Sequence, residues 1–96
     1  MNRLRLPVRV PNEGARRLAW WLCEQPRDAM KRLADTLPVE PTTVERWISG
    51  GIEPGAEVSY AISLFTQHAV VTSDWRSPPE GGWFDRPAPR TYRKAA

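Results

Sequence analysis

Apolar residues recur at helical spacing along the first half of the chain. The first group falls at i, i+3, i+4 and i+7, which places its members on one helical face: Ala15, Leu18, Ala19 and Leu22. Asn12 is a favourable N-cap residue, and Glu13 suits the first turn because an acidic side chain interacts well with the helix dipole there. The pattern predicts a first helix from residue 13 to about residue 25.

Prolines and a glycine delimit the next two helices. Pro26 suits the first position of a helix, and the residue before Pro38 avoids the helical region, so a second helix is expected over 26–36. Its apolar stripe consists of Ala29, Met30, Leu33, Ala34 and Leu37. A third helix is expected to begin at Pro41 and to end at Gly50, because glycine enters the left-handed C-terminal position at little cost.

The third helix and its successor also have an apolar face. The residues of the third helix that we expect to face inward are Val44, Trp47 and Ile48. A fourth helix is expected from near Gly55 to near Gln67, with an apolar stripe of Val58, Ala61, Ile62 and Phe65. Residues 72–75 are typical of a single capped turn.

The two ends of the chain differ from the middle. Residues 1–11 alternate between apolar residues and arginines, but two prolines restrict them to an edge strand or an extended arm. Residues 77–96 are rich in proline and glycine, so we expect a tail that is either disordered or draped over the domain. Trp83 and Phe84 in this tail are expected to pack on the domain or on a second subunit. The prediction is an all-α fold of four to five short helices at 12–76, with basic flanks.

Composition excludes several classes of protein. A chain of 96 residues forms one domain at most. Cys23 is the only cysteine and His68 the only histidine, which excludes an intrachain disulfide and a multi-histidine metal site. We find neither an apolar run long enough for a membrane span nor a secretory signal, and therefore expect a cytoplasmic protein. No residue set typical of nucleophilic catalysis or phosphate binding is present, so no catalytic residue, metal or cofactor is expected.

Positive charge is concentrated in the flanks. The net charge is +3. Residues 12–75 carry six basic and nine acidic residues, whereas each flank has an excess of three positive charges. A basic arm suits a polyanion such as nucleic acid, although a solubilising tail has the same composition. The arm residues that we expect to reach DNA are Arg3, Arg5, Arg9, Arg90, Arg93 and Lys94.

The second and third predicted helices fit a helix-turn-helix, since both are short and only four residues join them. In this region the residues that resemble the Cro/repressor-type (XRE-like) DNA-binding proteins are Leu33, Ala34, Val39, Thr43, Val44, Trp47, Gly50 and Pro54. Residues 66–70 and 74–76 are similar to the ending of phage Cro and YdaS-type regulators. The resemblance covers about residues 13–76.

Two departures from that family affect the backbone. The family usually has glycine in the turn where this chain has Pro38, and proline cannot take positive φ, so the turn is expected to differ. Gln67 and His68 replace paired glycines in the downstream motif, so we expect that bend to be reshaped.

The exposed face of the third helix supplies the candidate base-reading residues. If its apolar residues face inward, the outward stripe is Thr42, Thr43, Glu45, Arg46 and Ser49. Arginine binds guanine through O6 and N7, glutamate accepts from the cytosine amino group, and threonine contacts the thymine methyl. The helix N-terminus enters the major groove in this motif. Candidate phosphate contacts are Arg27 and Lys31, followed by Arg16 and Arg17.

These observations and the resemblance imply a sequence-specific transcriptional regulator. We expect a repressor of a phage or mobile element, Cro-like or anti-CRISPR-associated, that binds double-stranded DNA as a homodimer on an inverted-repeat operator. The alternative is a helix-turn-helix scaffold that binds a protein partner, as an inhibitor or an antitoxin-like module.

Overall fold

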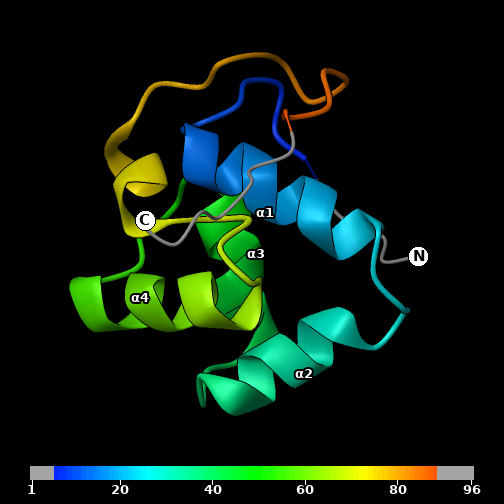
Figure 1. Cartoon of the computed structure of the whole chain (residues 1–96), viewed down its shortest axis with the longest axis vertical. Helices are drawn as coiled ribbons and strands as arrows, with labels where there is room; N and C mark the ends of the chain where they lie inside the picture. Colours follow the sequence, from blue (N-terminus) through cyan, green and yellow to red (C-terminus); the bar gives the residue numbers. More distant parts are fainter. Residues whose placement is uncertain (1–5, 89–96) are drawn as a thin grey trace, which may run out of the picture.

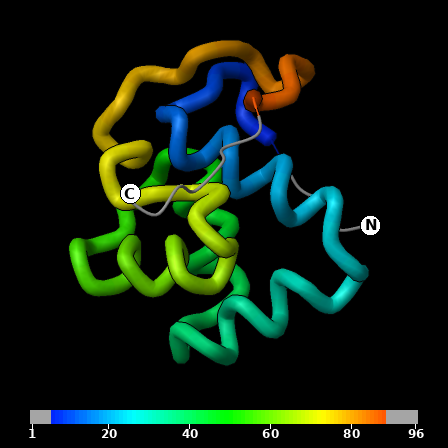
Figure 2. The backbone as a smooth tube through the Cα atoms, in the orientation of Figure 1, coloured from blue at the N-terminus to red at the C-terminus, as the bar shows by residue number. Residues whose placement is uncertain are grey.

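The computed structural model describes residues 6–88, and this part of the chain is all helical (Figure 1). Its elements, in chain order, are α1 (Glu13–Cys23), α2 (Ala29–Thr36), α3 (Pro41–Ser49), α4 (Ala56–Phe65) and the 3₁₀ helix η1 (Thr72–Arg76). The all-α prediction is confirmed, and no strand occurs between residues 6 and 88. Of the two alternatives for the N-terminal segment, an edge strand or an extended arm, the edge strand does not occur in residues 6–11, where the prolines leave an irregular segment that crosses above α1 (Figure 2).

The predicted helix ends agree with the structure to within two residues, with one exception. The Asn12 side chain accepts a hydrogen bond from the backbone N–H of Ala15 at 2.7 Å and caps α1. Gly50 ends α3 with φ +84°. The predicted start of the second helix is wrong, because the carbonyl of Pro26 accepts from the N–H of Ala29 at 3.0 Å. This i to i+3 bond closes a turn, so α2 begins three residues later than expected.

The core lies where α1, α3, α4 and η1 converge, with α2 packed beside α3. The three side chains expected to face inward from α3 are all buried: Val44, Trp47 and Ile48. Ala34 of α2 is fully buried, and Val39 in the connecting turn packs against the core. The contact between α2 and α3 is therefore made by the small and apolar side chains that the spacing indicated.

Gly14 permits η1 to lie directly on α1. A Cβ at this position would be 2.6 Å from Cε3 of Trp75, whose side chain is buried. In η1, the Asp74 carboxylate accepts from the N–H of Val71 at 2.9 Å, as expected for a capped turn. The aromatic ring of Trp75 thus occupies the place that any larger residue at Gly14 would need.

The bend after α4 keeps a backbone conformation that glycine favours. Gln67 has φ 55° and His68 has φ 69°, both in the left-handed region. The N–H of His68 donates to the carbonyl of Ser63 at 2.8 Å, and the Thr66 hydroxyl accepts from the N–H of Val70 at 3.2 Å. The bend is therefore left-handed at two residues that are not glycine, which raises its conformational cost by about 1–2 kcal/mol per residue.

Residues 77–88, which we call the C-terminal strap, are draped over α1 (Figures 1 and 2). The carbonyl of Ser77 accepts from the N–H of Glu13 at 3.1 Å. Further along, the indole N–H of Trp20 donates to the carbonyl of Trp83 at 2.9 Å. The Trp83 indole in turn donates to the carbonyl of Pro7 at 2.8 Å, which ties the strap to the N-terminal segment.

The buried carboxylate of Glu13 also holds the strap in place. Glu13 is only 1% exposed, and its side chain accepts from Arg16 at 2.6 Å, from Arg17 at 2.8 Å and from the N–H of Glu80 at 2.8 Å. Arg16 also donates to the carbonyl of Asp85 through Nε at 3.2 Å and Nη2 at 2.9 Å. Since a buried charge is stable only when paired and hydrogen-bonded, the strap completes the environment of this ionic group.

Candidate nucleic-acid interface

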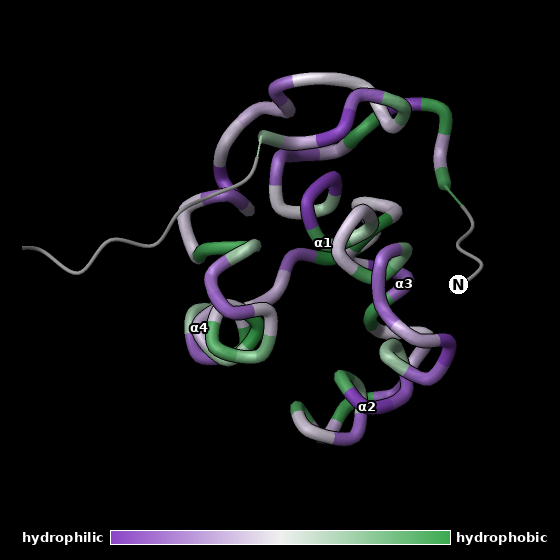
Figure 3. The backbone as a smooth tube through the Cα atoms, turned by 45° about the vertical axis from the view of Figure 1, so that its right-hand side comes forward, coloured by the Kyte–Doolittle hydropathy of each residue, from purple (hydrophilic) through white to green (hydrophobic). Residues whose placement is uncertain are grey.

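The outward face of α3 is open to solvent. Four residues of the predicted base-reading stripe are exposed and Thr43 is half-buried, the exposed ones being Thr42, Glu45, Arg46 and Ser49. Because the opposite side of α3 is locked in the core, the helix cannot rotate to hide this stripe. The strap passes over α1 at the end of the molecule opposite α2, and α3 lies between these ends with its outward stripe exposed (Figure 3).

Ser49 differs from its neighbours in how its hydroxyl is used. The Ser49 Oγ donates to the carbonyl of Arg46 at 3.2 Å, in the last turn of α3. The same carbonyl also accepts from the N–H of Gly50 and from the N–H of Gly51 at 2.9 Å, so the Ser49 hydroxyl is engaged in the hydrogen bonds that end α3. This makes Ser49 the weakest of the five candidates for contact with a base.

The turn between α2 and α3 accommodates Pro38 without a left-handed residue. It runs from Leu37 to Glu40, and no residue in it has positive φ. The N–H of Val39 donates to the carbonyl of Ala34 at 2.9 Å, which closes the end of α2. As expected from the proline, the turn differs from one built around glycine.

Of the four predicted phosphate contacts, the structure leaves two accessible. Arg27, which precedes α2, and Lys31, in its first turn, are exposed. By contrast, the side chains of Arg16 and Arg17 are 5% and 10% exposed and are held by the Glu13 carboxylate beneath the strap. The i+3 and i+4 spacing from Glu13 was a signal for these ion pairs, but it did not indicate that they would be buried.

Of the predicted arm residues, Arg9 lies within the described part of the chain and is exposed. The others lie outside the described residues: Arg3, Arg5, Arg90, Arg93 and Lys94.

The α2–α3 region has no net charge. Residues 27–49 contain four basic and four acidic residues. Arg32 is paired with Asp28 at 3.4 Å on the surface of α2. Attraction to a polyanion by this region alone would be weak, because each acidic side chain opposes the basic ones.

The described part of the chain contains one thiol, Cys23 at the end of α1. Cys23 is half-buried, and burial raises the pKa of its thiol, with a further increase from the Glu24 carboxylate nearby. Within residues 6–88, no group of three or more acidic, cysteine or histidine side chains is placed to hold a metal ion. No helix in the same range is long and apolar enough to cross a membrane.

Comparison with known proteins gives no relative: no family model, curated protein or solved structure matches the chain.

Proposed function

We propose that this protein is a sequence-specific DNA-binding regulator and that α3 reads base edges in the major groove. The observation that carries the proposal is the division of α3 into a buried apolar side and an exposed polar side. A short helix held rigidly by its neighbours, with hydrogen-bonding side chains facing outward, suits the wide major groove.

Arg46 has the leading role in this proposal. Its guanidinium is exposed and suits bidentate binding to guanine, which contributes about 1–3 kcal/mol of discrimination. Glu45 would accept from a cytosine amino group, while Thr42 and Thr43 would contact a thymine methyl or a phosphate near the helix N-terminus. The four side chains would together read a few adjacent base pairs.

Electrostatic attraction would come from outside α3. Arg27 and Lys31 at the start of α2 would contact phosphates, and the arginine-rich flanks would add charge that the neutral α2–α3 region lacks. Binding would therefore depend strongly on salt even though the reading helix contributes little to that dependence.

A single α3 contacts too few base pairs for a regulator, so we propose that two copies bind an inverted repeat with half-sites about one helical turn apart. Bound at a promoter, such a dimer would exclude polymerase, which makes repression the simplest output. The natural first operator to examine is the DNA upstream of the protein's own gene.

The test is DNA binding by Arg46→Ala, measured by fluorescence anisotropy on duplexes selected for the wild-type protein. We expect a loss of about 1–3 kcal/mol and relaxed preference at one base pair. The matched control is Arg76→Ala, which removes the same charge from an exposed side chain of η1, outside α2 and α3. It should weaken binding slightly and equally for all sequences, and equal effects of the two variants would contradict base reading by α3.

The neutral charge of the α2–α3 region supports a second candidate, a protein-binding module. Tyr60 and Leu64 add exposed apolar surface on α4. In that case DNA binding would be weak and insensitive to Arg46→Ala, and a protein partner would remain bound during purification.

A further inference from the structure

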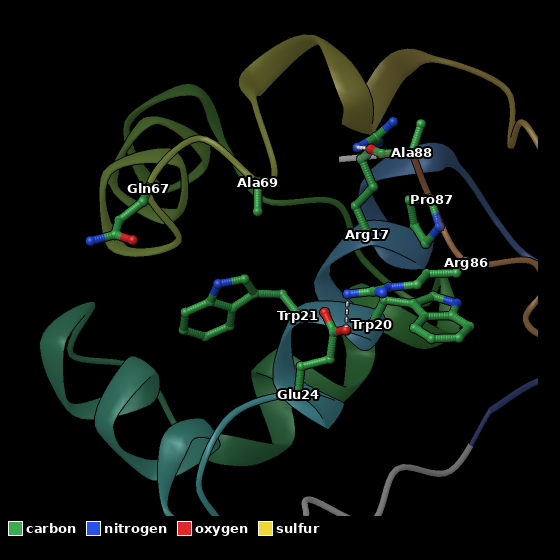
Figure 4. Close-up of a pocket in the computed structure, with 9 residues that line it drawn as sticks. All are labelled: Arg17, Trp20, Trp21, Glu24, Gln67, Ala69, Arg86, Pro87 and Ala88. Atoms are coloured by element: carbon green, nitrogen blue, oxygen red, sulfur yellow. Dashed lines mark hydrogen bonds and ion pairs between the residues drawn. The ribbon is translucent and has the colours of Figure 1, made fainter. Parts of the chain in front are cut away.

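A cleft opens on α1 beside the last described residues of the C-terminal strap. Figure 4 shows its walls, which α1, the bend after α4 and residues 86–88 form together. The cleft has a volume of about 240 Å³. Its side chains differ in character from one end to the other, and that difference indicates what kind of molecule it would hold.

One end of the cleft is apolar, and its side chains are fixed. In Figure 4, Trp21 extends toward the side of Ala69. The Trp21 ring makes an edge-on contact with Phe65, with ring centroids 5.6 Å apart. Trp20 is also held, because its indole N–H donates to a strap carbonyl at 2.9 Å. Both indole side chains are half-buried, so a planar ring that enters the cleft would pack against rings that are already ordered.

The other end of the cleft carries an ion pair at the surface. Figure 4 shows the Arg86 guanidinium against the Glu24 carboxylate, next to Trp20. The two charged side chains are 63% and 43% exposed, so the pair contributes little to stability and exchanges easily. A guanidinium has five N–H donors in a fork that suits a carboxylate. Arg86 is therefore able to bind the acid group of a ligand in place of Glu24 or beside it.

We propose that this cleft binds a small aromatic carboxylate, whose ring packs against Trp21 and whose acid group binds Arg86. A ligand must have both groups to use both ends of the cleft. A cavity of about 150 Å³ accommodates benzene, so the volume of the cleft leaves room for one ring and its acid group.

Charge in the walls favours an anionic ligand over a cationic one. The cleft is lined by two guanidinium groups and one carboxylate, that of Glu24. Arg17 is already engaged by the Glu13 carboxylate and the carbonyl of Ala88, so Arg86 is the group that binds the ligand. A cation drawn to Glu24 would be repelled by both guanidinium groups, whereas an anion meets only the charge that it displaces from Arg86.

Titration of the full chain with sodium benzoate, followed by proton–nitrogen correlation NMR, tests the proposal. The chain has five tryptophans, whose indole N–H signals act as separate reporters. We expect saturable shifts of the Trp20 and Trp21 signals with a dissociation constant of about 1 mM, as for a small ligand at an exposed guanidinium. The signals of Trp47 and Trp75, both buried in the core, should not move.

Three further probes of similar size examine each part of the ligand. Cyclohexanecarboxylate keeps the charge but lacks the aromatic ring, and should bind about two- to tenfold more weakly than benzoate. Benzyl alcohol keeps the ring but lacks the charge, and should bind about two- to fivefold more weakly. Benzylamine carries the opposite charge, and if it binds as tightly as benzoate, the assignment of an anion is wrong.

The two members of the ion pair should have opposite effects on benzoate binding. Arg86→Gln removes the partner of the acid group and should weaken binding by about two- to fivefold. Glu24→Gln removes the competing carboxylate and should strengthen binding by a similar factor of about two to five. Both side chains are exposed, so both variants should keep the fold, which circular dichroism checks. Changes of the same sign, or no change in either variant, would show that the ligand does not bind at Arg86.

The proposal is overturned if the Trp20 and Trp21 signals stay in place up to the solubility limit of benzoate. It is also overturned if the Trp47 and Trp75 signals shift as strongly, because binding is then not confined to the cleft. The site does not depend on the proposed function, and Arg46→Ala should bind benzoate like the wild type. Failure of DNA reading by α3 would therefore leave the cleft proposal standing, and the converse also holds.

Discussion

The α2–α3 region and the C-terminal strap are fixed to the same small core by different forces. The α2–α3 contact consists of apolar side chains at helical spacing, all supplied by residues near one another in sequence. The strap is held by hydrogen bonds to backbone groups more than sixty residues away: Arg16 and Trp20 donate to strap carbonyls, and the Glu13 carboxylate accepts from a strap N–H. Apolar contacts of the first kind tolerate some substitution, whereas a buried ionic group depends on every partner.

The largest effect is expected from Glu13→Gln. This change leaves the buried Arg16 guanidinium without its counter-charge, which costs about 3–5 kcal/mol. Urea denaturation should report the loss, and limited proteolysis should cut within residues 77–88 before it cuts the helices. Glu24→Gln is the control, since it removes an exposed ion pair with Arg86 that contributes at most about 1 kcal/mol. Equal stability of the two variants would show that the strap does not depend on the buried carboxylate.

A second way to test the comparison is Gly14→Ala, which adds one methyl group to an apolar contact on the same helix. The new Cβ would overlap the Trp75 ring, and the resulting strain should cost about 1–3 kcal/mol. Gly55→Ala is the matched control, because no atom lies within 4 Å of the added group. Thermal unfolding of the two variants should separate them clearly. A tolerated Gly14→Ala would mean that η1 moves freely on α1.

The smallest effect, and the one stabilising change, is expected at the bend after α4. Gln67→Gly and His68→Gly relieve positive φ, and each should raise the free energy of unfolding by about 1 kcal/mol. The opposite control is Gly50→Ala, which introduces a side chain at φ +84° and close to Pro11, and so should destabilise. Chemical denaturation measures all three. If both glycine variants lose stability, the side chains of Gln67 and His68 contribute more than their backbone strain costs.

The same contrast explains which features of the fold could be predicted from the sequence. Helical spacing and N-cap or C-cap residues indicated the helices, because each signal lies within one turn of the structure that it specifies. The burial of Val44 and Trp47 followed from that spacing, and the exposure of Arg46 followed from their burial. The start of α2 was misplaced because a proline at the first helical position and a proline that closes a turn look alike in sequence.

The contacts that hold the strap could not be predicted from the sequence, for a physical reason. Glu13, Arg16 and Arg17 have the spacing of a solvent-exposed ion-pair network, and only the covering strap makes them buried. Proline and glycine in the tail excluded regular structure, but they left open whether the segment would be ordered. Contacts between residues this distant in sequence have no local periodicity to indicate them.

The hydrogen bond between the Trp83 indole and the carbonyl of Pro7 spans seventy-six positions of the chain. During synthesis on the ribosome, α1 and the segment before it emerge well before the strap that covers them. The ionic pairs of Glu13 must therefore stay hydrated until the strap follows, and contacts of such high sequence separation form slowly. We infer that docking of the strap on α1 is the last step of folding, so that α2 and α3 form before the strap covers α1.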